Sequence, residues 1–281
     1  MYRRRFLTLL GLATAWPLVA HAAPDGFRAL PKSLWVWKTP LARAPEAAAF
    51  AHRHGFGTVF YSVPPAERGG AAKVASGLSA FRDRGIRVYA VAGSPAWARQ
   101  PNLPRPLAEL IELGGKGAFD GLCLDVEPHT LPAWRESRPE LMAGYVAFMA
   151  RASERAKAAG LSLCAATVPA YSNQPVAEGG TVMERVAKLS QSTALMAYRS
   201  DPERALKVAR RSLDQLDGCK RPWWFGVTAK RDAPAEISYG RVSPATFKTA
   251  LVSLDAGLRG RPGYLGIAVN DYLSLRELLE G

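Results

Sequence analysis

Eight strand-length apolar runs alternate with helix-like segments along the chain, and this alternation limits the choice of fold more than any other feature. The runs are rich in β-branched and aromatic residues and cover residues 34–37, 58–63, 86–93, 119–127, 161–169, 193–199, 222–229 and 263–271. Helical patterns cover residues 45–54, 71–84, 106–113, 140–159, 182–189, 202–216, 244–256 and 273–279. The sequence therefore predicts eight consecutive strand and helix units.

Strict alternation of strands and helices predicts parallel strands joined by right-handed crossovers. Eight units favour closure into a single (β/α)8 barrel of the TIM type over an open sheet. An open, doubly wound sheet would be marked by a glycine-rich phosphate loop after the first strand, and residues 34–46 contain none. We therefore expect one barrel domain over residues 23–281, with its functional residues at the carboxyl ends of the strands.

The beginning of the chain has the pattern of an export signal. A run of arginines at residues 3–5 precedes a short apolar stretch, and Ala20 and Ala22 are spaced like a signal-peptidase site. We therefore expect a signal peptide over residues 1–22 and a periplasmic or secreted protein, exported by the Sec or the twin-arginine route. No later segment has the roughly 20 apolar residues of a membrane-spanning helix, so we expect no stable membrane insertion.

The chain is strongly basic, with a formal net charge of +13 at pH 7. This excess favours an anionic partner such as an acidic envelope polymer, although a generally basic surface explains it equally well. The basic residues are scattered over the predicted helices and form no recognised nucleic-acid module, so we expect no nucleic-acid partner. The sequence makes no prediction of an oligomeric state.

The three cysteines and four histidines do not form a metal-binding pattern. The sequence has no Cys-x-x-Cys pair and no His-x-His or His-Glu-x-x-His spacing, so we expect no metal ion and no cofactor. Cys123 and Cys164 fall on the fourth and fifth runs. There we expect two small core residues rather than a disulfide.

The fourth run ends in two carboxylates that share one face of the strand. Side chains alternate along a strand, so Asp125 and Glu127 face the barrel interior together with Cys123, and the apolar residues between them face the helices. At about 6 to 7 Å apart along the strand, the two acids interact, and one of them can hold a proton near neutral pH as a general acid does. The structural alternative is a buried salt bridge to Arg199 or Lys230.

The segment DGLCLDVE, residues 120–127, resembles the DGxDxDxE signature of the chitinase-like family 18 glycoside hydrolases. Asp125 and Glu127 are in register with it, and Cys123 stands where that signature has its first inner aspartate. The segment MAYR is similar to the family's Met-x-Tyr-Asp motif, with Tyr198 matched and Arg199 in place of the aspartate. The chain also resembles a group of exported bacterial barrels of unassigned activity, which carry LDVEP, Met-x-Tyr-Arg and a final Asp-Tyr pair.

The resemblance implies a retaining mechanism in which an N-acetyl group of the substrate attacks the anomeric carbon. In that scheme Glu127 protonates the glycosidic oxygen, Asp125 orients the acetamido group, and Tyr198 donates a hydrogen bond to the same group. An arginine at position 199 suits a carboxylate or phosphate on the ligand. A conventional two-carboxylate mechanism, with Asp271 or Glu236 as the second acid, stays open.

Further binding candidates lie at the predicted strand ends, where aromatic faces stack on sugar rings. With the cationic Arg199 and the loop histidine that follows Glu127, the candidate substrate-binding residues are Arg199, Trp37, Tyr61, Trp97, His129, Tyr171, Asp271 and Tyr272.

The sequence thus favours an exported glycoside hydrolase-like enzyme that acts on a carbohydrate polymer, either amino-sugar-containing or acidic. A catalytically silent barrel that binds envelope glycans is the first alternative, and Cys123 and Arg199 favour it. A deacetylase or lyase is the second alternative, and the lack of a metal-ligand set disfavours it.

Overall fold

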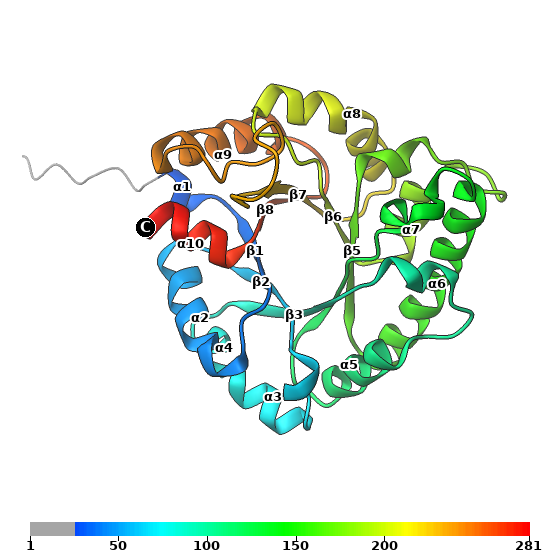
Figure 1. Cartoon of the computed structure of the whole chain (residues 1–281), viewed down its shortest axis with the longest axis horizontal. Helices are drawn as coiled ribbons and strands as arrows, with labels where there is room; N and C mark the ends of the chain where they lie inside the picture. Colours follow the sequence, from blue (N-terminus) through cyan, green and yellow to red (C-terminus); the bar gives the residue numbers. More distant parts are fainter. Residues whose placement is uncertain (1–25) are drawn as a thin grey trace, which may run out of the picture.

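A computed structural model describes residues 26–281, so the predicted signal peptide lies outside the described residues. Eight parallel strands follow one another around a closed barrel, and the last pairs with the first (Figure 1). The strands are β1 (Lys32–Val36), β2 (Thr58–Tyr61), β3 (Arg87–Ala92), β4 (Gly121–Leu124), β5 (Ser162–Thr167), β6 (Ser192–Leu195), β7 (Trp223–Thr228) and β8 (Tyr264–Asn270). The predicted single (β/α)8 barrel is confirmed.

Helices surround the ring of strands on all sides (Figure 1). The helices are α1 (Gly26–Ala29), α2 (Ala44–Arg53), α3 (Ala71–Gly77), α4 (Ser79–Arg82), α5 (Arg105–Gly115), α6 (Arg138–Ala158), α7 (Val182–Leu189), α8 (Pro202–Gly218), α9 (Pro244–Leu258) and α10 (Tyr272–Glu280). The helix predicted over residues 71–84 is two helices. Glycine is a poor helix former, and after Gly77 the backbone of Leu78 leaves the helical range at φ −97° and ψ 0°.

Alternation along the strands divides the apolar side chains into two layers. The barrel interior is filled by one buried residue or two from each strand, namely Trp35, Phe60, Val91, Cys123, Cys164, Ala166, Ala194, Met196, Trp224 and Ala268. The intervening residues pack outwards under the helices, as Leu122, Leu124 and Val126 do. The predicted facing of the fourth strand is therefore confirmed, and its acids lie on the inner face.

Two further predictions concern the cysteines and membrane-spanning helices. Cys123 and Cys164 are neighbours in the register of β4 and β5, and both are buried and free, as expected of core residues. Within residues 26–281, no helix is both long and apolar enough to cross a membrane.

Candidate active site

The two acids lie just beyond the end of β4, where the strand emerges at the carboxyl end of the barrel. The N–H of Asp125 still donates to the carbonyl oxygen of Ala92 at 2.9 Å, so β3 and β4 remain paired up to this residue. Gly93 makes that approach feasible, because a β-carbon there would lie 1.7 Å from the carbonyl oxygen of Asp125. Glu127 begins the 3₁₀ turn η4 (Pro128–Thr130), whose Thr130 hydroxyl donates to the Glu127 carbonyl oxygen at 2.8 Å.

Burial shifts both carboxyl groups towards the protonated form. Burial, helped by the charge of Glu127 and opposed by the Lys230 ammonium, raises the pKa of Asp125 to about 7. Burial also raises the pKa of Glu127, again opposed by Lys230. Two interacting acids with raised pKa values can hold one proton between them near neutral pH, as general acid catalysis requires.

Neither acid serves as a salt-bridge anchor. Among the described residues, no lysine or arginine forms an ion pair with Asp125 or Glu127. Lys230 lies 3.9 Å from Asp271 instead, and Arg199 donates to the carbonyl oxygen of Tyr198 at 2.6 Å. The alternative of a buried salt bridge to Arg199 or Lys230 is therefore wrong, because neither side chain pairs with Asp125 or Glu127.

Tyr198 and Asn270 face one another across the mouth of the barrel. The Nδ2 group of Asn270 donates to the Tyr198 hydroxyl at 3.3 Å. A β-carbon on Gly226 would lie 3.3 Å from the Tyr198 ring and closer still to the β6 backbone, so this glycine leaves room for the ring. The Oδ1 atoms of Asn270 and Asp125 are both buried without a hydrogen-bond partner. Because buried polar atoms are ordinarily paired, these two oxygens are free to accept donors from a ligand or from water.

His129 lies between Glu127 and two packed tyrosine rings. Its Nδ1 lies 3.0 Å from the hydroxyl oxygen of Tyr171, and its Nε2 lies 3.8 Å from Oε1 of Glu127. The Tyr171 ring packs on Tyr145 of α6 with centroids 5.5 Å apart. The Tyr145 hydroxyl is buried without a partner, and the charge of Asp125 adds to the burial that raises its pKa.

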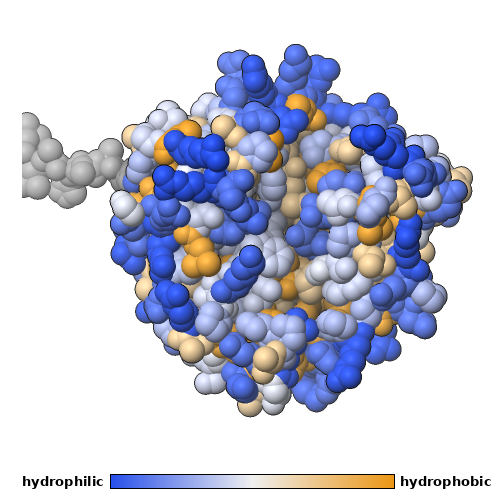
Figure 2. Space-filling view, viewed as in Figure 1, coloured by the Kyte–Doolittle hydropathy of each residue, from blue (hydrophilic) through white to orange (hydrophobic). Residues whose placement is uncertain are grey.

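A hollow of about 350 Å³ opens beside these residues. It is mostly apolar and carries three of the expected site residues; its lining is His129, Val168, Pro169, Ala170, Met196, Ala197, Tyr198, Arg199, Val208 and Ile237. Figure 2 shows the barrel face hollowed near its centre, with hydrophilic residues around the hollow. Trp37 follows β1 and packs, half-buried, on top of the interior cluster. A mostly apolar hollow with a few polar groups suits a sugar ring.

Three aromatic residues expected to bind substrate are buried elsewhere. Tyr61 and Trp97 belong to the outer layer, where the Tyr61 hydroxyl donates to Thr39 at 2.7 Å and Trp97 packs on Phe148. Tyr272 is 1% exposed within the same outer layer. The expected substrate contacts of these three residues are corrected, because their side chains fill the space between strands and helices. Tyr171, also expected to bind substrate, is 1% exposed in the same layer, and its hydroxyl meets His129 instead.

Asp271 also has a structural task. Its Oδ1 accepts the N–H of Ser274 at 3.0 Å and so caps the first turn of α10. Its other oxygen faces Lys230, so Asp271 is engaged on both sides. The neighbouring residue Asn270, which the sequence reasoning passed over, is the one that faces the barrel. The alternation along β8 is the signal that identifies it, since Ala268 is an interior residue.

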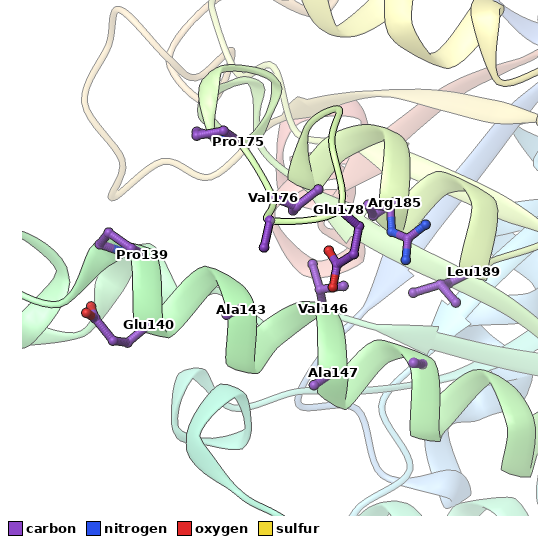
Figure 3. A pocket seen from close by; sticks show the side chains of 12 residues that line it. Pro139, Glu140, Ala143, Val146, Ala147, Pro175, Val176, Glu178, Arg185 and Leu189 are labelled. Atoms are coloured by element: carbon purple, nitrogen blue, oxygen red, sulfur yellow. The ribbon is translucent and has the colours of Figure 1, made fainter.

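A second hollow of about 560 Å³ lies outside the barrel, between α6 and α7 (Figure 3). Apolar residues such as Val146, Val176 and Leu189 line it, and Glu178 and Arg185 stand at its edge. It contains none of the expected site residues. Within residues 26–281, no group of three or more histidine, cysteine, aspartate and glutamate side chains could hold a metal ion.

Solved structures share this fold. Superposed on a family 18 chitinase from Pseudoalteromonas aurantia, the chain gives a TM-score of 0.59 at 12% identity, covering 89% of this chain and 96% of the chitinase. A class V chitinase from Nicotiana tobaccum gives 0.53 at 14% identity, covering 90% and 99%. A deoxyribose phosphate aldolase from Aeropyrum pernix gives 0.50 at 11% identity, covering 91% of each chain.

These likenesses confirm the barrel and its resemblance in fold to the chitinases. An aldolase shares the barrel too, so the fold alone does not assign a reaction. The reaction has to be inferred from the residues of the site. No protein-family model matches the chain. No curated protein matches it significantly either.

Proposed function

We propose that the protein is an exported, periplasmic or secreted glycoside hydrolase that cleaves a polysaccharide containing N-acetylated amino sugars, with Glu127 as the general acid. The observation that carries the proposal is the carboxylate pair after β4. Asp125 and Glu127 both have raised pKa values, and among the described residues neither pairs with a lysine or arginine. A raised pKa favours the protonated form of Glu127, which can give its proton to a leaving oxygen.

The polar groups around the pair complement an acetamido group. The buried Oδ1 of Asp125 has no partner and can accept the acetamido N–H. Asn270 donates to the oxygen of the Tyr198 hydroxyl, which leaves the hydroxyl proton free for the acetamido carbonyl. Held in this way, the carbonyl oxygen of the substrate is positioned to attack the anomeric carbon.

The reaction then follows in two steps. Glu127 protonates the glycosidic oxygen as the acetamido carbonyl oxygen bonds to the anomeric carbon and the glycosidic bond breaks. The resulting oxazolinium ion is opened by water, and the Glu127 carboxylate accepts a proton from that water. Two displacements at one carbon retain its configuration. Asp271 and Glu236 are poor second acids for a carboxylate-pair mechanism, because Asp271 is engaged as a cap and Glu236 is exposed.

Arg199 and Lys230 support an anionic form of this substrate. Arg199 lines the hollow beside Tyr198 and forms no ion pair within the described part of the chain. The Lys230 side chain is 39% exposed near the acids. A sugar that carries a carboxylate close to its acetamido group, as in the glycan strands of peptidoglycan, would meet both cations.

The experiment compares three probes with the purified protein: chito-oligosaccharides, the same oligosaccharides after removal of their N-acetyl groups, and peptidoglycan glycan strands. Reducing ends and product masses are measured. We expect cleavage of the N-acetylated probes, and a rate at least about 100-fold lower without the acetyl group, because the internal nucleophile is lost. Equal rates would contradict the mechanism. Binding of the N-acetylated probes without any cleavage would instead support a glycan-binding barrel.

A further inference from the structure

His129 connects two residues that are far apart in the sequence. Its Nδ1 lies 3.0 Å from the Tyr171 hydroxyl oxygen in the 3₁₀ turn η6 (Pro169–Asn173), and its Nε2 lies 3.8 Å from Oε1 of Glu127. Each ring nitrogen therefore has its own partner. The two contacts are of different kinds, since the first is a hydrogen bond and the second is an electrostatic contact.

The direction of the first hydrogen bond follows from the burial of Tyr171. Tyr171 is 1% exposed, and besides Nδ1 its hydroxyl meets the backbone N–H of His129, which is a donor. A buried hydroxyl donates where an acceptor is present, and within residues 26–281 the acceptor that the Tyr171 hydroxyl meets is Nδ1 of His129. Burial raises the pKa of Tyr171 and lowers that of His129, so the phenol keeps its proton and the imidazole is neutral. The single ring proton of His129 is then on Nε2, which faces Glu127.

Aromatic rings fix the imidazole in this orientation. The Trp134 ring is nearly perpendicular to it, at a centroid distance of 6.2 Å and an interplanar angle of 78°, and the Tyr171 ring lies at 5.7 Å and 74°. Trp134 is itself covered by the guanidinium of Arg138, 4.9 Å from the ring centroid. The histidine side chain is only 26% exposed. A ring held on two sides loses the rotational freedom of a surface histidine.

We propose that His129, fixed by Tyr171, is a positioning residue for Glu127 and replaces the inner acidic partner that Cys123 cannot supply. This inference rests on the proposed role of Glu127 as the acid. The Nε2–H group directed at Oε1 leaves Oε2 as the oxygen that carries the acidic proton. After Glu127 has given up that proton, the same N–H stabilises the carboxylate, and the contact shortens as charge develops.

Other groups face Glu127 from the surrounding elements, and they are the background against which His129 acts. They are Asp125, also after β4, Tyr145 on α6, Tyr171 in η6, Tyr198 after β6 and Lys230 after β7. Lys230 alone among them favours the charged carboxylate. An N–H donor from His129 therefore acts in the same direction as Lys230, and its removal leaves Glu127 easier to protonate.

The first test determines, without any substrate, which nitrogen of the His129 ring carries the proton. Long-range 1H–15N NMR of the histidine-labelled protein distinguishes the two neutral forms of imidazole, and a His129→Gln spectrum assigns the signal. We expect the proton on Nε2 in the wild type and a mixture in Tyr171→Phe, which keeps the ring but lacks the hydroxyl. A wild-type proton on Nδ1 would overturn the proposal.

The second test follows the carboxyl group of Glu127 by 13C NMR titration. His129→Leu removes the donor, whereas His129→Gln keeps an N–H group near the position of Nε2. We expect the midpoint of Glu127 to move to higher pH in His129→Leu and to stay near the wild-type value in His129→Gln. With chito-oligosaccharides as substrate, kcat should fall about 10- to 100-fold in His129→Leu, while KM changes less than about twofold. In His129→Gln, kcat should return most of the way to the wild-type value.

The two tests separate this inference from the proposed function. If the ring proton and the Glu127 titration behave as expected but the wild type cleaves none of the glycan probes, the proposed function is wrong and the contact stands. If the wild type cleaves them and His129→Leu titrates and turns over like the wild type, the role of His129 is wrong and the function stands. Equal losses in the Leu and Gln variants would also overturn the role, because they would indicate a structural effect.

Discussion

The carbonyl oxygen of Asp125 lies 1.7 Å from the place that a β-carbon on Gly93 would occupy. No residue with a side chain fits at position 93 unless the end of β4 moves. The closeness of the two strand ends therefore fixes the backbone that carries both acids, although Gly93 itself contacts no substrate.

A Gly93→Ala substitution should disturb the site and the fold together. The methyl group overlaps the Asp125 backbone, so we expect a loss of about 1–3 kcal/mol in the free energy of unfolding and a fall in kcat of roughly tenfold or more. Urea unfolding and hydrolysis of chito-oligosaccharides measure the two effects. Gly218→Ala in α8 is the matched control, because nothing lies within 4 Å of its β-carbon position and alanine favours a helix. An unchanged Gly93→Ala protein would contradict the packing.

The hydrogen bond between Asn270 and Tyr198 should appear as an energetic coupling. We expect Asn270→Leu and Tyr198→Phe each to lower kcat/KM about tenfold, because both changes remove the oriented hydroxyl donor. The double variant should lose little more than either single variant, since the two residues act as one unit. Steady-state kinetics of the four proteins give the coupling. Strictly additive losses would indicate that the two side chains act independently.

The raised pKa of Asp125 predicts a pH-dependent stability. The folded-state pKa of about 7 exceeds the unfolded value of about 4, so the folded form binds more protons between these pH values. The free energy of unfolding should therefore fall as the pH rises from about 4 to about 7, and level off above. Asp125→Asn removes this effect and should be more stable than the wild type at pH 8, by as much as about 4 kcal/mol.

Urea unfolding at a series of pH values between 4 and 8 measures that difference. The gap between Asp125→Asn and the wild type should close as the pH falls towards 4, because Asp125 is then neutral in both states. The exposed Asp232→Asn serves as a control for the loss of one charge. A gap that stays constant with pH would show that Asp125 is not held in its protonated form.

Arg199 should decide between anionic and neutral substrates. We expect Arg199→Gln to lower kcat/KM for peptidoglycan glycan strands about tenfold more than for chito-oligosaccharides, because only the former carry carboxylates. Raising the salt concentration should reduce this difference. Arg210→Gln on the exposed side of α8 controls for the change in net charge. Equal effects of Arg199→Gln on both substrates would show that Arg199 does not recognise the carboxylate.

The barrel and the acid pair could be predicted from the sequence because both follow from regular periodicities. Eight repeats of strand and helix indicate closure, and alternation along one strand places Asp125 and Glu127 together. The same alternation, applied to β2, would have excluded Tyr61: Phe60 faces the interior, so the next residue faces the helices. A position near a strand end does not by itself place a side chain inside the barrel.

The contacts that tune the site could not be predicted in this way. The approach of His129 to Tyr171 joins loops after two different strands, and the position of Tyr145 depends on how α6 packs over them. No periodicity fixes a loop conformation, since loop geometry depends on contacts that are distant in the sequence. Only the assembled barrel brings these residues to the acid.

The most direct test of the account is the turnover and binding of Glu127→Gln. The amide has nearly the same shape as the acid but donates no acidic proton, so hydrolysis of the N-acetylated glycans should fall by at least about 1,000-fold while their dissociation constants stay within about threefold. Glu140→Gln, an exposed change on α6, should match the wild type. Wild-type turnover by Glu127→Gln would contradict the assignment of this residue as the general acid.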